Sequence, residues 1–212
     1  RASEAPGEAR ALEANRALLL AQAHDDVDAL DALERAFAPA PLPGLSANES
    51  ISALHADREG RLWVGTHNGL VVIGPDGRLA LLAGTREQVG SDLPWVVDDF
   101  CEARDGTIWL ATHSGAVHYD GLAFRLFTIA EGLPSNHLTC VAETRSGHIC
   151  VGTWGAGLSV YDGRVWNWAA RPDGLVHESV QDIVEDPDGR MWVASEGGLM
   201  RYRRYETPPA VA

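Results

Sequence analysis

The larger part of the chain alternates short apolar runs with turn residues. From Leu45 onward, β-branched and aromatic stretches such as "RLWVGT" and "TIWLAT" are separated by Gly, Asp and Asn. Runs of this length and composition are typical of β-strands joined by tight turns. The 22 glycines among 212 residues also fit many turns better than long helices. We therefore expect an all-β region over residues 45–205.

Residues 1–40 follow a different pattern. They are rich in Ala, Leu and Glu, and their apolar residues recur at spacings of three and four, or close multiples. This periodicity predicts amphipathic helices. Asp25 or Asp26 is a suitable N-cap for a second helix, and the prolines from Pro39 to Pro43 end it. We expect a short helical N-terminal segment that packs on the β region or belongs to a preceding domain.

The β region consists of four copies of one unit. The copies match without gaps when they are aligned on the turn glycines Gly60, Gly106, Gly147 and Gly189, which are spaced 46, 41 and 42 residues apart. A period of about 40 residues with four strands in each copy is typical of β-propeller blades. A single sheet cannot bury both of its faces, so neighbouring copies must stack.

We expect the four blades to span residues 45–83, 93–132, 133–174 and 175–205. They form either a four-bladed ring or part of a wider ring, and we favour the partial ring because blades of this size suit wide propellers. A partial ring exposes apolar end faces. The N-terminal helices, a second copy of the chain or further blades of a parent chain would then cover these faces.

One column of the repeat is nearly all tryptophan. Three residues after the anchor glycines stand Trp63, Trp109, Cys150 and Trp192. A bulky residue at the same place in successive copies indicates packing between blades. Cys140 and Cys150 fall on adjoining strands, roughly opposite each other. A strained cross-strand disulfide is therefore an alternative to free packed thiols, which we favour.

Charge and motif content exclude several classes of function. The formal net charge of −13 disfavours nucleic acid and anionic membrane surfaces as partners. No apolar run approaches the roughly 18 residues of a membrane span. The sequence has neither a CxxC motif nor a Ser-His-Asp arrangement, and the aspartates beside the anchor glycines suit turns better than calcium. We expect no catalytic residues, no metal and no cofactor.

A variable column follows the tryptophan strand, and it contains His67, His113, Trp154 and Glu196. The loops that join successive blades carry Trp95, Asn136, His137 and His177. Because strands alternate in direction, both sets should emerge on the same face of the blades. Aromatic rings beside imidazole and amide groups suit a sugar or a peptide, so we take these eight residues as the candidate binding face. A zinc site shared by equivalent histidines of successive blades is disfavoured, because such positions lie roughly 10 Å apart whereas zinc bonds measure about 2.1 Å.

Two passages, "GLPSNHLTCVAETRSGHICVGTWGAGLSVYDG" and "DGLVHESVQDIVEDPDGRMWVASEGGLMRY", resemble the two-component regulator propeller repeat. The resemblance covers about residues 45–205 and none of the first forty. It implies the sensor region of hybrid histidine kinases and related regulators, a periplasmic or other extracytoplasmic location, and often carbohydrate as the ligand. Typical members also have more repeats, a Tyr-rich domain, a membrane helix and a kinase. The resemblance here extends only to the sensor-like part.

Three functions are compatible with these features. The favoured one is a non-enzymatic, ligand-binding or sensory module of signal transduction that recognises a small molecule, an oligosaccharide or a protein. The second is an enzyme similar to the propeller lyases, with a metal and histidine site built from His67, His113, His137 and Glu196. The third is a structural scaffold that packs against other chains or against itself.

Overall fold

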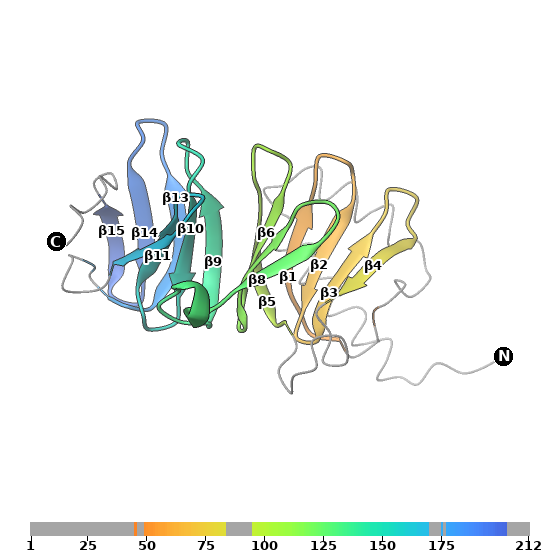
Figure 1. The fold of residues 1–212 in the computed structure, drawn as a ribbon, viewed down its shortest axis with the longest axis horizontal. Helices are drawn as coiled ribbons and strands as arrows, with labels where there is room; N and C mark the ends of the chain where they lie inside the picture. The colour runs from red at the N-terminus through yellow and green to blue at the C-terminus, as the bar shows by residue number, and fades with distance from the viewer. Residues whose placement is uncertain (1–44, 46–48, 84–94, 170–174, 176, 203–212) are drawn as a thin grey trace. The chain divides into compact units, whose positions relative to one another are not determined.

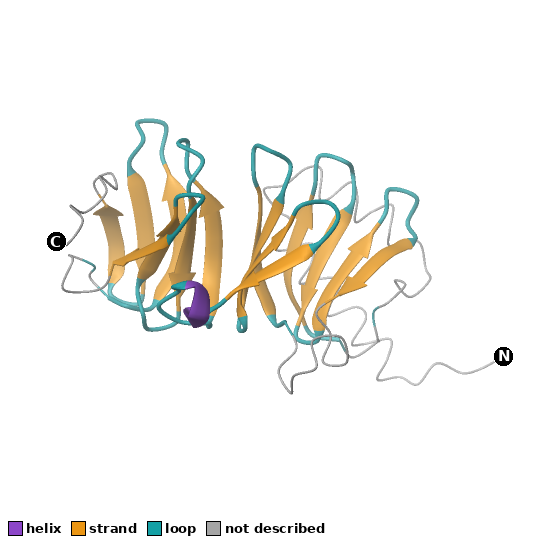
Figure 2. Ribbon diagram, in the orientation of Figure 1, coloured by secondary structure: helices purple, strands orange, loops and turns teal. Residues whose placement is uncertain are grey.

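The computed structural model describes residues 45, 49–83, 95–169, 175 and 177–202. Antiparallel strands joined by tight turns make up nearly all of this part, as Figure 2 shows. The helices expected over residues 1–40 lie outside the described residues. Among the described residues, no helix has the length and apolar character needed to cross a membrane.

The strands form four antiparallel sheets, each a meander with its strands in chain order (Figure 1). The first contains β1 (Ile51–Ala56), β2 (Leu62–Thr66), β3 (Gly69–Ile73) and β4 (Leu79–Ala83). The second contains β5 (Val97–Glu102), β6 (Ile108–Thr112), β7 (Gly115–Tyr119) and β8 (Phe124–Phe127). The third contains β9 (Leu138–Glu143), β10 (Ile149–Thr153), β11 (Leu158–Tyr161) and β12 (Trp166–Ala169). The fourth contains β13 (Val180–Glu185), β14 (Met191–Ser195) and β15 (Gly198–Tyr202).

The architecture is therefore the all-β, propeller-type array of blades that the repeat predicts. Among the described residues, one short 3₁₀ helix, η1 (Ile129–Glu131), precedes the third blade. It begins with a capping box in which Thr128 and Glu131 satisfy each other's backbone N–H groups. The chain divides into two compact units, residues 1–100 and 101–212, and the boundary falls within β5.

The anchor glycines explain the strongest column of the repeat. Each closes the turn between the first and second strands of its blade, and their φ angles are +74°, +85°, +83° and +76° at Gly60, Gly106, Gly147 and Gly189. Side chains with a Cβ adopt such angles only with strain, whereas glycine adopts them freely. Glycine recurs at this position because the turn requires a left-handed residue.

In the first and last blades an aspartate links this turn to the tryptophan column. Asp57 Oδ2 accepts a 2.7 Å hydrogen bond from Trp63 Nε1, and Asp186 Oδ2 accepts one of 2.9 Å from Trp192 Nε1. Asp57 also accepts from Arg61 Nε at 2.5 Å. Burial alone would raise the pKa of Asp57, but the hydrogen bonds from Trp63 and Arg61 outweigh it and hold that pKa below its ordinary value. The carboxylate therefore stays charged inside the blade.

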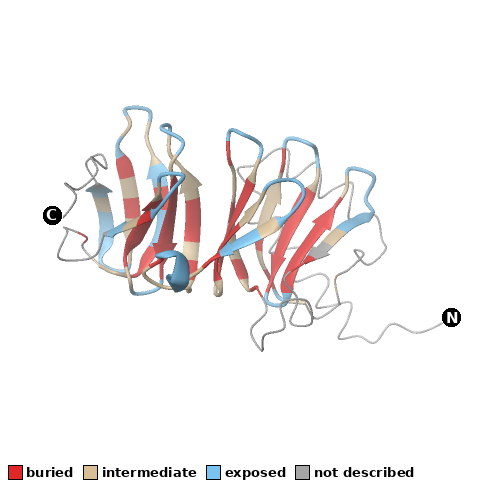
Figure 3. Ribbon diagram, viewed as in Figure 1, coloured by how far each residue is buried: buried red, intermediate tan, exposed pale blue. Residues whose placement is uncertain are grey.

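Within residues 101–212, aromatic side chains join the second blade to the third. The Trp109 ring lies 5.8 Å from that of Tyr161 and 6.3 Å from that of Trp166, centroid to centroid. Phe127 completes the cluster at 5.6 Å from Trp109. Trp63, Trp109 and Cys150 are at most 5% exposed, as expected of packing residues, whereas Trp192 is half-buried. Figure 3 shows buried strand interiors and exposed turns in each sheet.

The cysteines do not pair. Cys150 lies opposite Ala142, and Cys140 lies opposite Gly152, so the two thiols are two residues out of register rather than facing each other. Both are buried, and none of Cys101, Cys140 and Cys150 forms a disulfide. Burial raises the pKa of the Cys150 thiol to about 12, which keeps it protonated and unreactive. The cross-strand disulfide alternative is therefore wrong, and the cysteines serve as small apolar residues.

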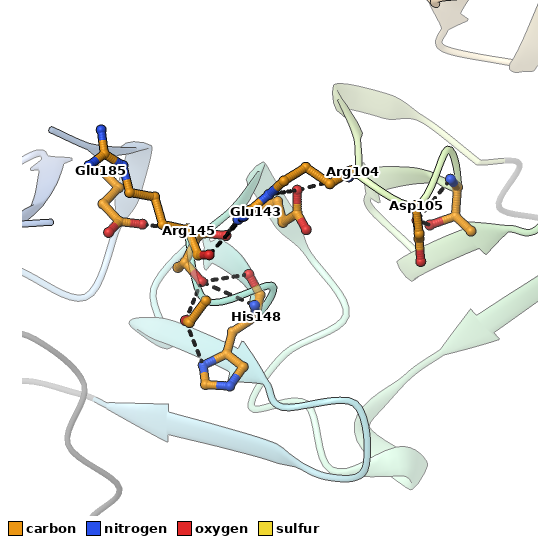
Figure 4. Close-up of polar contacts among 9 residues, drawn as sticks. Arg104, Asp105, Glu143, Arg145, His148 and Glu185 are labelled. Carbon is orange, nitrogen blue, oxygen red and sulfur yellow. Dashed lines mark hydrogen bonds and ion pairs between the residues drawn. The ribbon is translucent and has the colours of Figure 1, made fainter. Parts of the chain in front are cut away.

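Arginines in the first turn of one blade bind the next blade (Figure 4). Arg104 donates from its backbone N–H to Glu143 Oε2 at 3.0 Å, and from its guanidinium to the same carboxylate at 3.2 Å and to the carbonyl of Arg145 at 2.8 Å. Arg145 repeats the arrangement one blade later, donating to Glu185 Oε2 at 2.6 Å and to the carbonyl of Pro187 at 2.5 Å. These contacts link the second blade to the third and the third to the fourth.

Candidate functional site

The turns between the second and third strands are held rigidly by one hydroxyl in each blade. Thr112 Oγ1 donates to the carbonyl of Gly115 at 2.7 Å and accepts from the N–H of Ser114 at 3.0 Å. Thr153 Oγ1 donates to the carbonyl of Gly157 at 2.8 Å. Both hydroxyls are fully buried. The next residue in each turn, His113 or Trp154, is therefore presented from a fixed backbone.

A second repeated contact brings these turns to the loops that precede the first strand of a blade. The N–H of Trp154 donates to the carbonyl of His137 at 3.0 Å, and the N–H of Glu196 donates to that of Ser179 at 3.1 Å. In the first blade, the N–H of His67 makes the same 3.0 Å bond to Ser50. The turn set and the loop set therefore meet at one edge of the blades, as the strand alternation predicts.

Neighbouring blades also meet at this edge. The β10–β11 turn forms a bridge between Trp154 and Ser179, and the N–H groups of Gly155 and Gly157 both donate to the carbonyl of Glu178, at 3.2 and 2.8 Å. The turn of the third blade is thus tied to the loop that enters the fourth. The turn residue of one blade lies beside the loop residue of the next.

This arrangement gathers three of the expected binding residues into one cluster, His113, His137 and Trp154. The rings of His113 and His137 have centroids 3.9 Å apart, and those of His137 and Trp154 stack at 5.9 Å with an interplanar angle of 16°. The histidines are half-buried, whereas Trp154 is 59% exposed. The cluster offers an open indole face beside two imidazoles.

A second pair lies on the fourth blade. His177 Nε2 is 3.9 Å from Glu196 Oε2, and His177 Nδ1 accepts a 3.0 Å hydrogen bond from the N–H of Ser179. That bond makes Nδ1 the acceptor and leaves Nε2 as the ring nitrogen nearer to the Glu196 carboxylate. The pair places an imidazole and a carboxylate at this edge of the fourth blade.

Three residues of the expected binding face, Trp95, Asn136 and His67, belong neither to this cluster nor to the His177–Glu196 pair. Trp95 is only 7% exposed, so its ring packs inside the protein and is not presented at the surface, contrary to expectation. Asn136 uses its side-chain oxygen to accept from the N–H of Ile129 at 2.9 Å, which shapes the loop itself. His67 is exposed on its turn in the first unit, residues 1–100.

The sequence did not point to Ser179. Its hydroxyl is buried and has no hydrogen-bond partner among the described residues, although its backbone joins Trp154 and Glu196. The signal was present in the repeat, because Ser50, His137 and Ser179 all stand ten residues before an anchor glycine. Buried hydroxyls usually bind water or another polar group, and this one lies beside the edge where the turns and loops meet.

Residues 44–68 and 174–197 match the model for the two component regulator propeller. Two segments of the chain are therefore similar to the two-component regulator propeller repeat. The matched segments contain the anchor glycines of the first and fourth blades. A search of the curated proteins gave no match.

Solved structures support the same fold. One is the extracellular domain of a hybrid two component system from B. thetaiotaomicron, with 24% identity, a TM-score of 0.63, and coverage of 70% of this chain and 21% of that one. Another is the extracellular domain of a one component system from B. thetaiotaomicron, with 24% identity, a TM-score of 0.57, and coverage of 76% and 22%. This chain thus spans about a fifth of the length of those two proteins.

A lyase also has a similar fold. The virginiamycin B lyase of Staphylococcus aureus, solved with quinupristin as an inactive H270A variant, is 13% identical, with a TM-score of 0.57 and coverage of 75% of this chain and 57% of the lyase. Similarity at this level concerns the fold alone.

Proposed function

We propose that these blades form part of an extracytoplasmic sensor propeller that binds a ligand without transforming it. The two sensor structures named above are extracellular domains, and the repeats match the regulator propeller. On this proposal further blades of a parent chain accompany the four seen here. The ligand signals by changing how the propeller contacts the rest of its receptor.

The binding site of this proposal is the cluster of His113, His137 and Trp154, and its preferred ligand is an oligosaccharide. The observation that carries it is the Trp154 indole, which is 59% exposed and stacks on His137 while the Trp154 backbone is held by the His137 carbonyl and the Ser179 bridge. An exposed indole is less favourable in water than a buried one. An exposed indole on a fixed backbone beside polar groups therefore suits ligand recognition. The flat C–H face of a sugar ring packs on an indole, while imidazoles bind its hydroxyls.

The test uses a matched pair of exposed tryptophans. A panel of oligosaccharides is titrated into the protein by calorimetry, and the best binder is repeated with Trp154→Ala and with Trp168→Ala. Trp168 is 56% exposed but lies on the outer strand β12, where it pairs with Ser159 and is separated from β10 by β11. We expect Trp154→Ala to weaken binding at least tenfold and Trp168→Ala to leave it within about twofold, since aromatic anchors dominate such sites.

Unfolding midpoints separate recognition from folding. Both variants should melt within about 1–2 °C of the parent, because neither side chain is part of the core. Equal loss of binding in both variants would place the ligand elsewhere on the blades. Conversion of any panel member into a product would contradict the non-enzymatic part of the proposal.

A further inference from the structure

The His113–His137 pair is closer than stacking alone requires. One ring nitrogen of His113 and one of His137 lie within 4.8 Å of each other. Two nitrogens bound to one tetrahedral zinc ion lie about 3.3 Å apart, given zinc–nitrogen bonds of about 2.0–2.1 Å. Metal binding would bring the two nitrogens closer by rotation of the half-buried rings about their χ2 bonds.

The backbone around the pair is fixed, which favours chelation over chance proximity. His113 follows the buried Thr112 hydroxyl that closes its turn. The N–H of His137 donates to Ser135 Oγ at 3.1 Å, and its carbonyl is bound by the N–H of Trp154. Both imidazoles therefore start from rigid backbone positions, so binding an ion would cost little conformational entropy.

We propose that His113 and His137 together bind a divalent transition-metal ion of the zinc or nickel class. Neutral imidazole is the favoured side-chain ligand for these ions, whereas magnesium and calcium prefer oxygen. Water and oxygen atoms of a ligand would complete the coordination at the open edge. The inference rests on the site of the proposed function, with the ion as a bridge between protein and ligand.

An alignment of equivalent repeat positions does not reveal the His113–His137 pair. His67 and His113 share a column, but His113 pairs with His137 from the loop of the next blade. The loop column holds Ser179 where the third blade holds His137, so the fourth blade offers a hydroxyl in place of the second imidazole. The described structure thus favours one metal site, between the second and third blades.

The primary experiment titrates Zn²⁺ into the full chain by calorimetry at pH 7.5, with Mg²⁺ as the comparison ion. We expect one zinc ion per chain and no magnesium binding. His113→Ala and His137→Ala should each weaken zinc binding at least about tenfold, because loss of even an outer-shell group costs that much. His67→Ala is the matched control, since it removes an exposed histidine from the same column and should change nothing.

A second readout does not depend on the alanine variants alone. Ni²⁺ bound at the pair lies next to the indole that stacks on His137, so it should quench Trp154 fluorescence. Trp154→Phe should remove that quenching while zinc affinity stays unchanged. Zinc binding that is absent, or that persists in both histidine variants, would overturn the inference. The zinc titration contains no sugar, so a failure to bind zinc is distinct from a failure to bind an oligosaccharide. The oligosaccharide titration is repeated with and without a chelator.

Discussion

Gly152 of β10 lies where the third blade packs on the first strand of the fourth. A Cβ atom added to it would lie 2.5 Å from Cys140 Sγ, 2.6 Å from Val180 Cγ1 and 3.0 Å from Val180 Cβ. Carbon atoms in contact are normally about 3.5–4.0 Å apart. Cys140 and Val180 are both buried, and rotation about χ1 cannot move the Cβ of Val180. Gly152→Ala therefore forces β13 away from β10.

Two opposing effects determine how much Gly152→Ala lowers the free energy of unfolding. Overpacking a well-packed core costs about 1–3 kcal/mol. The φ angle of Gly152 is not in the left-handed region, so alanine also restricts the unfolded chain and returns about 0.4–1 kcal/mol. We expect a net loss of about 1–2 kcal/mol. For a chain of this size that lowers the melting temperature by about 2–8 °C.

The repeat itself shows how the clash is relieved. Gly65 stands in the same column, and a Cβ there would lie 2.9 Å from the Cβ of Val97. The second blade instead has Ala111 in this column, and the corresponding residue of the third blade is Leu138 in the same core. Glycine thus occurs with valine, which branches at Cβ, and alanine occurs with leucine, which branches one carbon further out.

The assay is thermal unfolding followed by circular dichroism for Gly152→Ala, Val180→Leu and the double variant. The double variant restores the alanine–leucine combination, so it should regain at least half of the stability lost in Gly152→Ala. Such coupling between contacting residues is commonly 0.5–3 kcal/mol. An unchanged melting temperature in Gly152→Ala, or an additive double variant, would refute the packing argument.

Three further predictions concern the repeated turns. Asp57→Asn should cost about 2 kcal/mol at pH 7, since it weakens charged hydrogen bonds in a buried site. Because the pKa of Asp57 is held below its ordinary value, this deficit should be full above about pH 4 and shrink as the pH falls through the lowered pKa, as denaturation at several pH values will show. Arg104→Ala removes the guanidinium bonds to the third blade and should cost about 1 kcal/mol in urea unfolding, with less effect in high salt. Arg164 is exposed, so Arg164→Ala is the control. An equal loss of stability in both variants would contradict a stabilising contact between Arg104 and the third blade. Gly147→Ala places a Cβ at φ +83° and should cost about 1–2 kcal/mol by the same measurement, whereas an unchanged midpoint would show that the turn tolerates a side chain.

The sequence alone established the repeat and therefore the fold. A turn that needs a left-handed residue selects glycine at Gly60, Gly106, Gly147 and Gly189, and a blade that must bury an indole selects tryptophan nearby. These requirements are local to one blade. They leave a periodic signal that needs no knowledge of what each blade packs against. The common edge of turns and loops followed from strand alternation in the same way.

Tertiary structure decided which side chains meet. Trp95 and Trp154 both lie outside the packing columns, yet Trp95 is buried and Trp154 is exposed. Cys140 and Cys150 differ from true cross-strand partners by two residues, because register depends on the length of the turn. The close pair His113–His137 joins different columns of adjacent blades. A repeat alignment compares equivalent positions, but contacts between blades join non-equivalent ones, and only the packing of one sheet on the next determines them.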